Sequence, residues 1–431
     1  GPPWRDGPTR VAPAAEFRCP PAGPRLINLT GRQDSAAESP AHRRGRVADP
    51  PREADLARRV RGRLASARPT GDGTTPWRTG PSPMFQPRAR YTQALTRIAV
   101  LHRGPSPTMQ SYLRPRFAEA AVPVVYYDLL SPLPPDAFSA GTFVIVVRYL
   151  TFPAARALRR ARAGLSGVAY LMDDDIPRAH QDPDLPRDYA YTMVAFWTVF
   201  RPILARLCSE IWVTSPGLEQ AYGGPYVHRI NPLYVGPAQP RARRASDQPA
   251  RIFYHGGRTH SRDKAWLAPI IARVQSARDE TVFETFGDRE VVKSFAGVPR
   301  CRVLHRMPWP DYLSYAAAER FDIGLAPAVP GTYNAARSFN KAYDITRCGA
   351  AGVYADVPSF REFVTHGRDG LLVDPCDPDA WERAIHALLD DPALRRRLHA
   401  AALERCRDIA ARERTSDLMR RLRAHTDGDG A

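Results

Sequence analysis

The sequence lacks any apolar run of the length that a membrane-spanning helix requires. Such a helix needs about 18 or more consecutive apolar residues, and no stretch of the 431-residue chain approaches that length. The start of the chain also lacks the charged, apolar and small-residue succession of a secretory signal. These absences predict a cytoplasmic protein, at most peripheral to the inner face of the cell membrane.

Cysteine is scarce, and its positions are scattered. The six cysteines are Cys19, Cys208, Cys301, Cys348, Cys376 and Cys406. None of them forms the closely spaced pair that metal-binding motifs use. The sequence therefore gives no support to a zinc site.

Lysine is almost absent, although the chain is strongly basic. Only three of its 62 Lys and Arg residues are lysine, and its formal net charge at pH 7 is +17. Nucleic acid, an anionic membrane or an acidic substrate could each balance such a charge. Because arginine is dispersed and no aromatic-basic motif stands out, we expect no specific nucleic-acid binding. Peripheral association with an anionic membrane stays open.

Methionine does not occur before Met84, and the preceding segment has no apolar periodicity. Residues 1–90 are rich in Pro, Arg, Gly and Ala, so they cannot bury enough apolar surface to offset the entropy of ordering. We expect a disordered basic extension with a helix near residues 51–67. It is either an upstream extension or misassigned translation start, or a tail that holds the protein on anionic lipid.

Two regions alternate short apolar runs with helix-length segments. In residues 251–373 the runs are residues 251–255, 282–286, 302–304, 323–326 and 352–355. Earlier runs begin at residues 98–102 and recur in VPVVYYDLL, TFVIVVRYL, GVAYLM and EIWVTS, with a helix expected at residues 109–121. This alternation is typical of parallel sheets covered by crossover helices. We expect the chemistry in the loops that follow the carboxyl ends of the strands.

The domain organisation follows from these regions. We predict an α/β fold with two Rossmann-like domains that face a cleft, at residues 91–238 and 250–402. A Pro-rich, basic linker at residues 239–249 separates them, and residues 403–431 form a C-terminal helix and tail.

Two loops favour a phosphate-bearing ligand. The first contains Gly256, Gly257 and Arg258, with Lys264 before the following helix. Glycines allow close backbone approach, a helix start offers unpaired N–H groups, and two cations neutralise a diphosphate.

The second loop opens a helix with Asn340 and Lys341. Asp344 follows three residues after the lysine, so that the ammonium and the carboxylate share one helical face. Lys341 is expected to meet phosphate, and Asp344 a ribose hydroxyl. Two of the three lysines of the chain thus lie in these two loops.

These motifs resemble the donor-binding half of a GT-B glycosyltransferase of the retaining family 4 group. In that family a Gly-Arg pair, followed six positions after the arginine by lysine, contacts the donor diphosphate; Gly257, Arg258 and Lys264 have this spacing. The segment from Asp344 to the GVYAD strand resembles the family's helix that bears a glutamate, with the turn and the strand that follow it. The later segment HGRDGLLVDP resembles a further strand of the family. The likeness covers residues 250–400.

One departure concerns the family's two glutamates, which lie eight positions apart. Asp344 takes the second position, and the first falls on Ala336. A subset of the family has an Asn-Lys pair before the carboxylate, which Asn340 and Lys341 resemble. Because Ala336 replaces the first acid, a non-catalytic nucleotide-sugar-binding protein is one alternative function. A nucleotide-sugar epimerase or hydrolase on the same fold is a second alternative.

The resemblance implies transfer of a sugar from a nucleoside diphosphate sugar, as co-substrate, to an acceptor hydroxyl. The acceptor would be a glycan, a glycolipid or a small molecule, the anomeric configuration would be retained, and no metal cofactor is expected. Arg258 and Lys264 would act as catalytic residues by stabilising charge on the leaving group. Gly104 would face the donor phosphates across the cleft; an ordinary strand-to-helix turn is its alternative interpretation.

Three consecutive aspartates, Asp173, Asp174 and Asp175, follow the apolar run GVAYLM. At a strand's carboxyl end they could bind acceptor hydroxyls, act as a base or hold a divalent metal. A solvated acidic turn in which Asp175 caps the next segment is the alternative. Because the phosphate loops are already cationic, we favour the acceptor side for all three, with Asp174 as a catalytic residue and no metal.

An aromatic and aliphatic stripe runs through the segment RDYAYTMVAFWTVFRPILARL. Such a stripe is more typical of a core helix than of a lipid site. A lipid-linked acceptor would nevertheless suit its exposed side.

Overall fold

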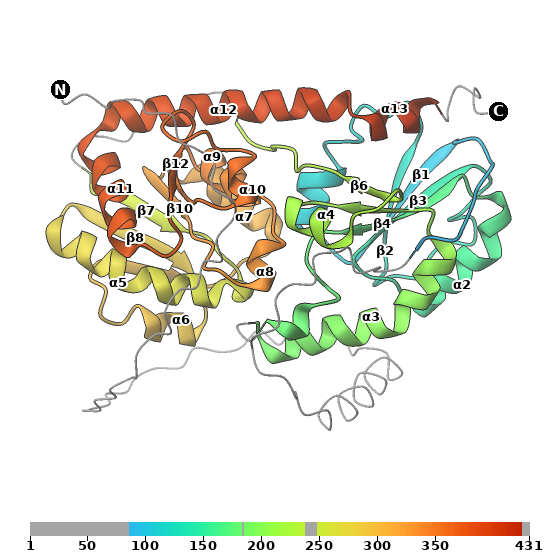
Figure 1. The fold of residues 1–431 in the computed structure, drawn as a ribbon, viewed down its shortest axis with the longest axis horizontal. Coiled ribbons are helices and arrows are strands. Elements are labelled where there is room, and N and C mark those ends of the chain that lie inside the picture. The colour runs from blue at the N-terminus through green and yellow to red at the C-terminus, as the bar shows by residue number, and fades with distance from the viewer. Residues whose placement is uncertain (1–85, 183–184, 238–247, 425–431) are drawn as a thin grey trace, which may run out of the picture.

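The computed structural model describes residues 86–182, 185–237 and 248–424 of the chain (Figure 1). They form two α/β domains side by side, the N-terminal one on the right of Figure 1 and the C-terminal one on the left. The helix expected near residues 51–67, and most of the predicted extension and linker, lie outside the described residues. No helix within the described part of the chain combines the length and apolar character that crossing a bilayer demands.

The N-terminal sheet has six parallel strands in the order β2-β1-β3-β4-β5-β6. They are β1 (Arg97–His102), β2 (Val124–Asp128), β3 (Thr142–Val147), β4 (Gly167–Met172), β5 (Glu210–Val213) and β6 (Val227–Arg229). The inner strands β3 and β4 are buried along their whole length, which explains their unbroken apolar sequence. The strands predicted in this half are confirmed.

The helices α2 (Phe152–Ala161), α3 (Arg187–Leu207) and α4 (Pro216–Tyr222) accompany this sheet, with short turns η2 (Arg162–Gly164) and η3 (Ala179–Gln181). The helix predicted at residues 109–121 is reduced to a π-helix, η1 (Met109–Leu113). Pro115 explains the difference, because it has no N–H with which to continue the hydrogen-bond ladder.

The C-terminal sheet is also parallel, in the order β12-β11-β10-β7-β8-β9. Its strands are β7 (Ala250–Tyr254), β8 (Thr281–Phe286), β9 (Cys301–Leu304), β10 (Ile323–Ala326), β11 (Ala351–Ala355) and β12 (Leu371–Val373). Its helices are η4 (Arg258–His260), α5 (Ser261–Ala277), α6 (Arg289–Ser294), α7 (Trp309–Ala318), α8 (Thr332–Ala335), α9 (Asn340–Arg347), α10 (Pro358–Arg361) and α11 (Pro378–Asp390). All five runs predicted in this half are strands.

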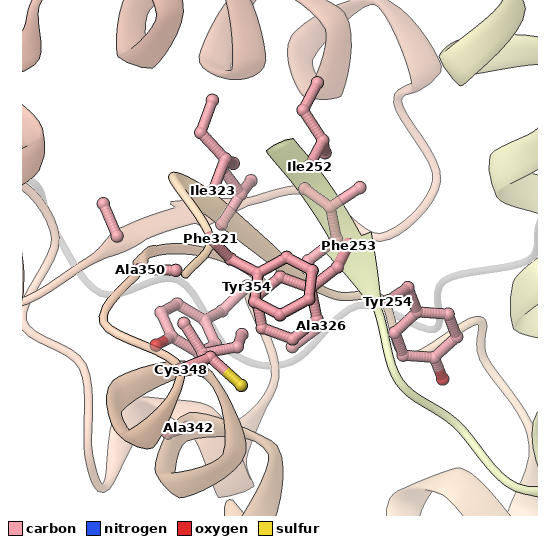
Figure 2. Packing of buried hydrophobic residues seen from close by; sticks show 14 of the residues in the cluster. Ile252, Phe253, Tyr254, Phe321, Ile323, Ala326, Ala342, Cys348, Ala350 and Tyr354 are labelled. Carbon is pink, nitrogen blue, oxygen red and sulfur yellow. The ribbon is translucent and has the colours of Figure 1, made fainter. Parts of the chain in front are cut away.

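The core of the C-terminal domain forms where these strands meet their helices. Ile252 of β7 and Ile323 of β10 lie on one face of the sheet, whereas Phe253 of β7 and Tyr354 of β11 lie on the other face, which Ala342 of α9 helps to cover (Figure 2). All five are almost fully buried. This packing fixes the positions of the loops that leave β7 and β10 and of the start of α9.

The last two helices connect the domains. Helix α12 (Pro392–Arg414) runs along the top of both domains, and α13 (Asp417–Ala424) ends over the N-terminal one (Figure 1). Cys406 and Ile409 of α12 belong to the C-terminal core, whereas Leu418 and Leu422 of α13 belong to the N-terminal core. A C-terminal helix is present as predicted, but the predicted boundary at residue 402 falls inside α12, and the C-terminal domain extends beyond it.

Candidate functional site

A cavity of about 470 Å³ opens between the two domains, at the carboxyl ends of both sheets. The N-terminal wall comes from the loops after β1, β3 and β4 and from the start of α3. The C-terminal wall comes from the loops after β7, β8, β9 and β10 and from the start of α9. The charged or titratable residues in the lining are Arg148, Asp173, Asp174, Tyr189, His255, His260, Arg306, Tyr312, Tyr333, Arg337, Lys341 and Asp344. The cavity thus lies where the strand pattern predicts the chemistry.

The glycine turn after β7 lines the cavity as predicted. Both Gly256 and Gly257 face it, and a Cβ on Gly257 would meet no atom within 4 Å. A Cβ on Gly256 would lie 2.9 Å from the Cβ of His260, so this position has no room for a side chain. The turn therefore leaves backbone accessible to a ligand.

Lys264 lies behind this turn and does not line the cavity. Its side chain in α5 is 1% exposed. Its Nζ donates to the carbonyl oxygens of Gly257, at 3.1 Å, and Phe286, at 2.6 Å. Burial lowers its pKa to about 8, and the charges of Lys341 and Arg306 act in the same direction. Contrary to the expected direct contact with phosphate, Lys264 supports the turn, because two of its three donors are used within the protein.

Arg258 also points away from the cavity. Its guanidinium, in η4, is 42% exposed and pairs with Asp188 of α3, with Nη1 2.9 Å from Oδ2. This ion pair bridges the two domains. The predicted contact between Arg258 and a diphosphate therefore requires that Asp188 release the guanidinium.

Helix α9 brings Asn340, Lys341 and Asp344 to the cavity together. The Lys341 Nζ lies 2.9 Å from Asp344 Oδ2, which confirms that the ammonium and the carboxylate share one helical face. Arg347 binds the other carboxylate oxygen at 2.6 Å. Asn340 donates to the hydroxyl of Tyr112 across the domain boundary, whereas its buried Oδ1 has no hydrogen-bond partner among the residues that the structure describes.

The carboxylates after β4 separate into two groups. Asp173 and Asp174 line the cavity, and Arg148 binds both of them. Asp175 instead is buried beneath the loop, where it accepts hydrogen bonds from Arg178 and Tyr222. Its predicted place on the acceptor side is therefore corrected, because both of its oxygens are already occupied in the domain interior.

The Asp174 side chain is largely buried at the cavity wall. Burial and the neighbouring charge of Asp173 raise the pKa of Asp174, although the guanidinium of Arg148 opposes this increase. The hydroxyl of Tyr189 lies 3.4 Å from Asp174 Oδ2, and that hydroxyl lies 2.9 Å from the hydroxyl of Tyr333 in the other domain. Asp174 is thus a carboxyl group at the junction of both walls.

The carboxylates of Asp173, Asp174 and Asp175 do not point toward one common position where a metal ion could bind all three. A guanidinium fills the space between Asp173 and Asp174, and Asp175 points elsewhere. Across the ranges that the structure describes, no group of three or more His, Cys, Asp or Glu side chains could hold a metal ion. The alternative that Asp173, Asp174 and Asp175 together hold a divalent metal therefore does not fit their arrangement.

Gly104 adopts a positive φ of 69° after β1, but it does not line the cavity. Its N–H donates to Asp128 Oδ1 at 3.1 Å. Ser106, Pro107 and Thr108 line the cavity in its place. The expectation that Gly104 faces a phosphate is thus corrected to the residues that follow it.

Three arginines in the cavity escape prediction from the sequence. Arg148 directly follows the apolar strand β3, the same signal that identifies Asp173 after β4. Arg306 is exposed and makes no ion pair with any residue that the structure describes. Arg337 binds Thr259 and the ring of His260 and lies over the ring of Tyr333. In a chain so rich in arginine, neither Arg306 nor Arg337 has a distinguishing sequence signal.

Two histidines of the C-terminal wall have hydrogen-bond partners within their own domain. His255 Nε2 lies 3.1 Å from Glu284 Oε1, and burial lowers the His255 pKa. His260 Nδ1 lies 3.0 Å from Asp263 Oδ2, and burial followed by the charge of Arg337 lowers the pKa of His260. Both rings are neutral near pH 7 and help to shape the wall.

Ala336, which takes the place of the family's first glutamate, faces the N-terminal domain. Its side chain is 2% exposed, and its carbonyl oxygen accepts a hydrogen bond of 2.6 Å from Ser215. A Cβ on the nearby Gly217 would lie 2.0 Å from the carbonyl oxygen of Ala335. The two domains are therefore in close backbone contact at this point.

Comparison with known proteins supports the resemblance. Residues 341–405 match the family model of glycosyl transferases group 1. A D-inositol 3-phosphate glycosyltransferase from Nocardioides sp. is 36% identical over 102 residues, and this match spans only 22% of this chain and 22% of that protein.

Two solved structures of Anabaena Alr3699/HepE share the architecture. The complex with UDP and glucose has a TM-score of 0.53 at 12% identity and covers 76% of this chain and 100% of that chain. The complex with UDP-glucose has a TM-score of 0.50 at 14% identity and covers 77% and 98%. At these identities the likeness shows the fold. The chain therefore has the GT-B fold, and its C-terminal domain carries the sequence pattern of the group 1 glycosyl transferases.

Proposed function

We propose that this chain is a glycosyltransferase that moves a sugar from a nucleoside diphosphate sugar to an acceptor hydroxyl. The observation that carries this proposal is the cavity between the domains. One wall combines an open glycine turn with cations, and the facing wall presents a carboxyl group of raised pKa. The group 1 pattern of residues 341–405 supports the same function.

The donor diphosphate would bind at the glycine turn. Lys341 and Arg306 line the cavity there, and both act on the pKa of Lys264 behind the turn, so the three cations lie within electrostatic range of one another. Positive charge fixed around the leaving group stabilises the negative charge that develops on it in the transition state. Lys264 contributes to this field through the turn, and Arg258 contributes when it leaves Asp188.

The nucleoside would lie along the same wall. Trp309 and Tyr312 line the cavity and stack on each other, with centroids 5.2 Å apart. Aromatic rings of this kind provide apolar contact for a base. Asp344 would accept a hydrogen bond from a ribose hydroxyl, as the sequence pattern predicts.

The acceptor would approach from the N-terminal wall, where Asp173 and Asp174 would hold its hydroxyl groups. Asp174 would exchange a proton with the reacting hydroxyl, because its raised pKa suits general acid–base work. Retention of configuration follows from the family resemblance. The proposed reaction needs no metal cofactor, since cations of the chain surround the diphosphate site. A glycan, a glycolipid or a small molecule fits as acceptor, and peripheral association with an anionic membrane would suit a glycolipid.

The experiment has two steps. A panel of nucleotide sugars is first screened by thermal shift, and the donor that stabilises the chain is then incubated with candidate acceptors. Detection of a sugar–acceptor product supports transfer. A free sugar or an epimer as the only product contradicts it in favour of a hydrolase or an epimerase.

A non-catalytic nucleotide-sugar-binding protein is the second candidate. The observation that favours it is the burial of Ala336 against Ser215, which leaves no carboxylate at the family's first acidic position. Donor binding in calorimetry without turnover on any acceptor is the result that identifies this function.

A further inference from the structure

Helix α2 presents a basic stripe that begins at an exposed phenylalanine. Phe152, Arg156, Arg159 and Arg160, here termed the α2 stripe, are all exposed. Their spacing of four, seven and eight residues from Phe152 places them on one face of the helix. The opposite face of α2 is buried in the N-terminal core.

In the described part of the chain, no acidic side chain forms an ion pair with the α2 stripe. Helix α2 has no Asp or Glu, and the neighbouring α3 has only Asp188, which Arg258 engages. Within the described ranges, the three arginines of the α2 stripe form no ion pair. On the C-terminal domain, by contrast, Arg273 and Arg278 of the α5 region pair with acids of α11. The unbalanced charge is therefore a property of this face and not only of an arginine-rich composition.

A row of aromatic rings links the α2 stripe to the cavity. Phe152 packs on Phe200 of α3, with ring centroids 5.0 Å apart, and Phe200 packs on Phe196 at 4.9 Å. Phe196 packs on Tyr149 at 5.4 Å, and Tyr149 directly follows Arg148 of the cavity wall. Part of the aromatic stripe in the sequence of α3 thus forms a continuous row of apolar contacts between the acceptor side and the surface.

We propose that the α2 stripe docks the protein on an anionic lipid bilayer, from which a lipid-linked acceptor enters the cavity. Guanidinium groups that meet anionic headgroups, together with an apolar side chain that enters the acyl boundary, are features of interfacial helices. Phe152 is 47% exposed, and Leu130, 64% exposed, follows β2 at the same edge of the sheet. Nucleic acid would match the charge but not these apolar side chains. The docking surface is inferred from the exposure, charge and packing of these side chains. Only the entry of a lipid-linked acceptor depends on the proposed function.

The test is co-sedimentation of the full chain with phosphatidylcholine vesicles that contain or lack phosphatidylglycerol. The wild-type chain binds only the anionic vesicles. The triple variant Arg156→Gln, Arg159→Gln, Arg160→Gln loses roughly 100-fold in partitioning, since each arginine near an anionic surface contributes about fivefold. A matched triple variant in α12, with Arg396, Arg397 and Arg412 changed to glutamine, has the same net charge and binds like the wild type.

A second variant separates insertion from charge. Phe152→Ser still binds at low salt but releases at salt concentrations that the wild type tolerates, whereas Phe152→Leu resembles the wild type. Equal losses in the two triple variants, or binding to duplex DNA without binding to anionic vesicles, overturn the proposal.

Calorimetric titration with the nucleotide sugar distinguishes a failure of the docking proposal from a failure of the proposed function. Vesicle binding by a chain that binds no nucleotide sugar leaves docking intact and contradicts the glycosyltransferase. Sugar transfer by a chain that does not bind anionic vesicles supports the glycosyltransferase and contradicts docking. We expect the triple variant in α2 to bind the nucleotide sugar as the wild type does.

Discussion

Replacement of Lys341 by methionine separates ligand binding from stability. The ammonium lies in the cavity wall, 22% exposed, and contacts only one oxygen of Asp344. Arg347, which is 4% exposed, continues to neutralise that carboxylate at 2.6 Å when the lysine is lost. We therefore expect the free energy of unfolding to fall by about 1 kcal/mol or less. A hydrogen bond between a charged group and a ligand contributes about 1.5–3 kcal/mol, so affinity for the diphosphate falls by about 10- to 150-fold.

The matched control is Arg347→Met. This change leaves the cavity ammonium in place but removes the hydrogen bonds of the buried Arg347 guanidinium to Asp344 and to the carbonyl oxygen of Val235. Since a hydrogen bond to a charged group contributes about 1.5–3 kcal/mol, the two together cost about 3 kcal/mol or more of stability. Both variants are compared with the wild type by urea unfolding and by calorimetric titration with the tightest-binding nucleotide among UDP, GDP and ADP. Unchanged nucleotide affinity in Lys341→Met, or a loss of stability as large as that of Arg347→Met, refutes the assignment of Lys341 to the diphosphate.

Three further predictions follow from the site. Asp174→Asn lowers the rate of sugar transfer by about 100-fold or more while donor affinity in calorimetry stays unchanged, as general acid–base work requires; an equal rate contradicts this role. Asp175→Asn destabilises the fold by about 3 kcal/mol in urea unfolding, because Arg178 and Tyr222 lose their partner, yet it leaves transfer intact below the unfolding temperature. In the folded chain the pKa of Lys264 is about 8, below the ordinary 10.5, so the unfolded chain binds more protons between pH 8 and pH 10.5. The free energy of unfolding of the wild type, relative to that of Lys264→Met, therefore rises by about 3 kcal/mol between these two pH values. A difference between the two proteins that does not change with pH contradicts this prediction.

The sequence predicts the strands and their parallel arrangement well because parallel strands are buried on both faces. Strands such as β4 therefore appear as unbroken apolar runs, and polar residues mark where they end. Helix extent is less predictable, since one missing N–H at Pro115 limits a helix that apolar spacing would extend to residue 121. The crossing of α12 and α13 to the N-terminal domain depends on tertiary contacts such as those of Leu418 and Leu422, which no local pattern shows.

The direction of each side chain is what sequence spacing cannot provide. Lys264 has the spacing of a phosphate ligand, but its ammonium turns toward two carbonyl oxygens behind the glycine turn. Asp175 belongs to the same acidic run as Asp174 and yet lies in the domain interior. Arg306 and Arg337 reach the cavity only because separate loops converge there, which no local motif records.

The segments at which a nucleotide binds test the proposed donor site most directly. Hydrogen–deuterium exchange of the full chain, with and without the tightest-binding nucleoside diphosphate sugar, reports this at the level of backbone segments. We expect protection in the glycine turn at residues 256–260 and at the start of α9, with little change in α11. Protection confined to other segments, or none with any nucleotide sugar in the panel, would contradict the proposed donor site.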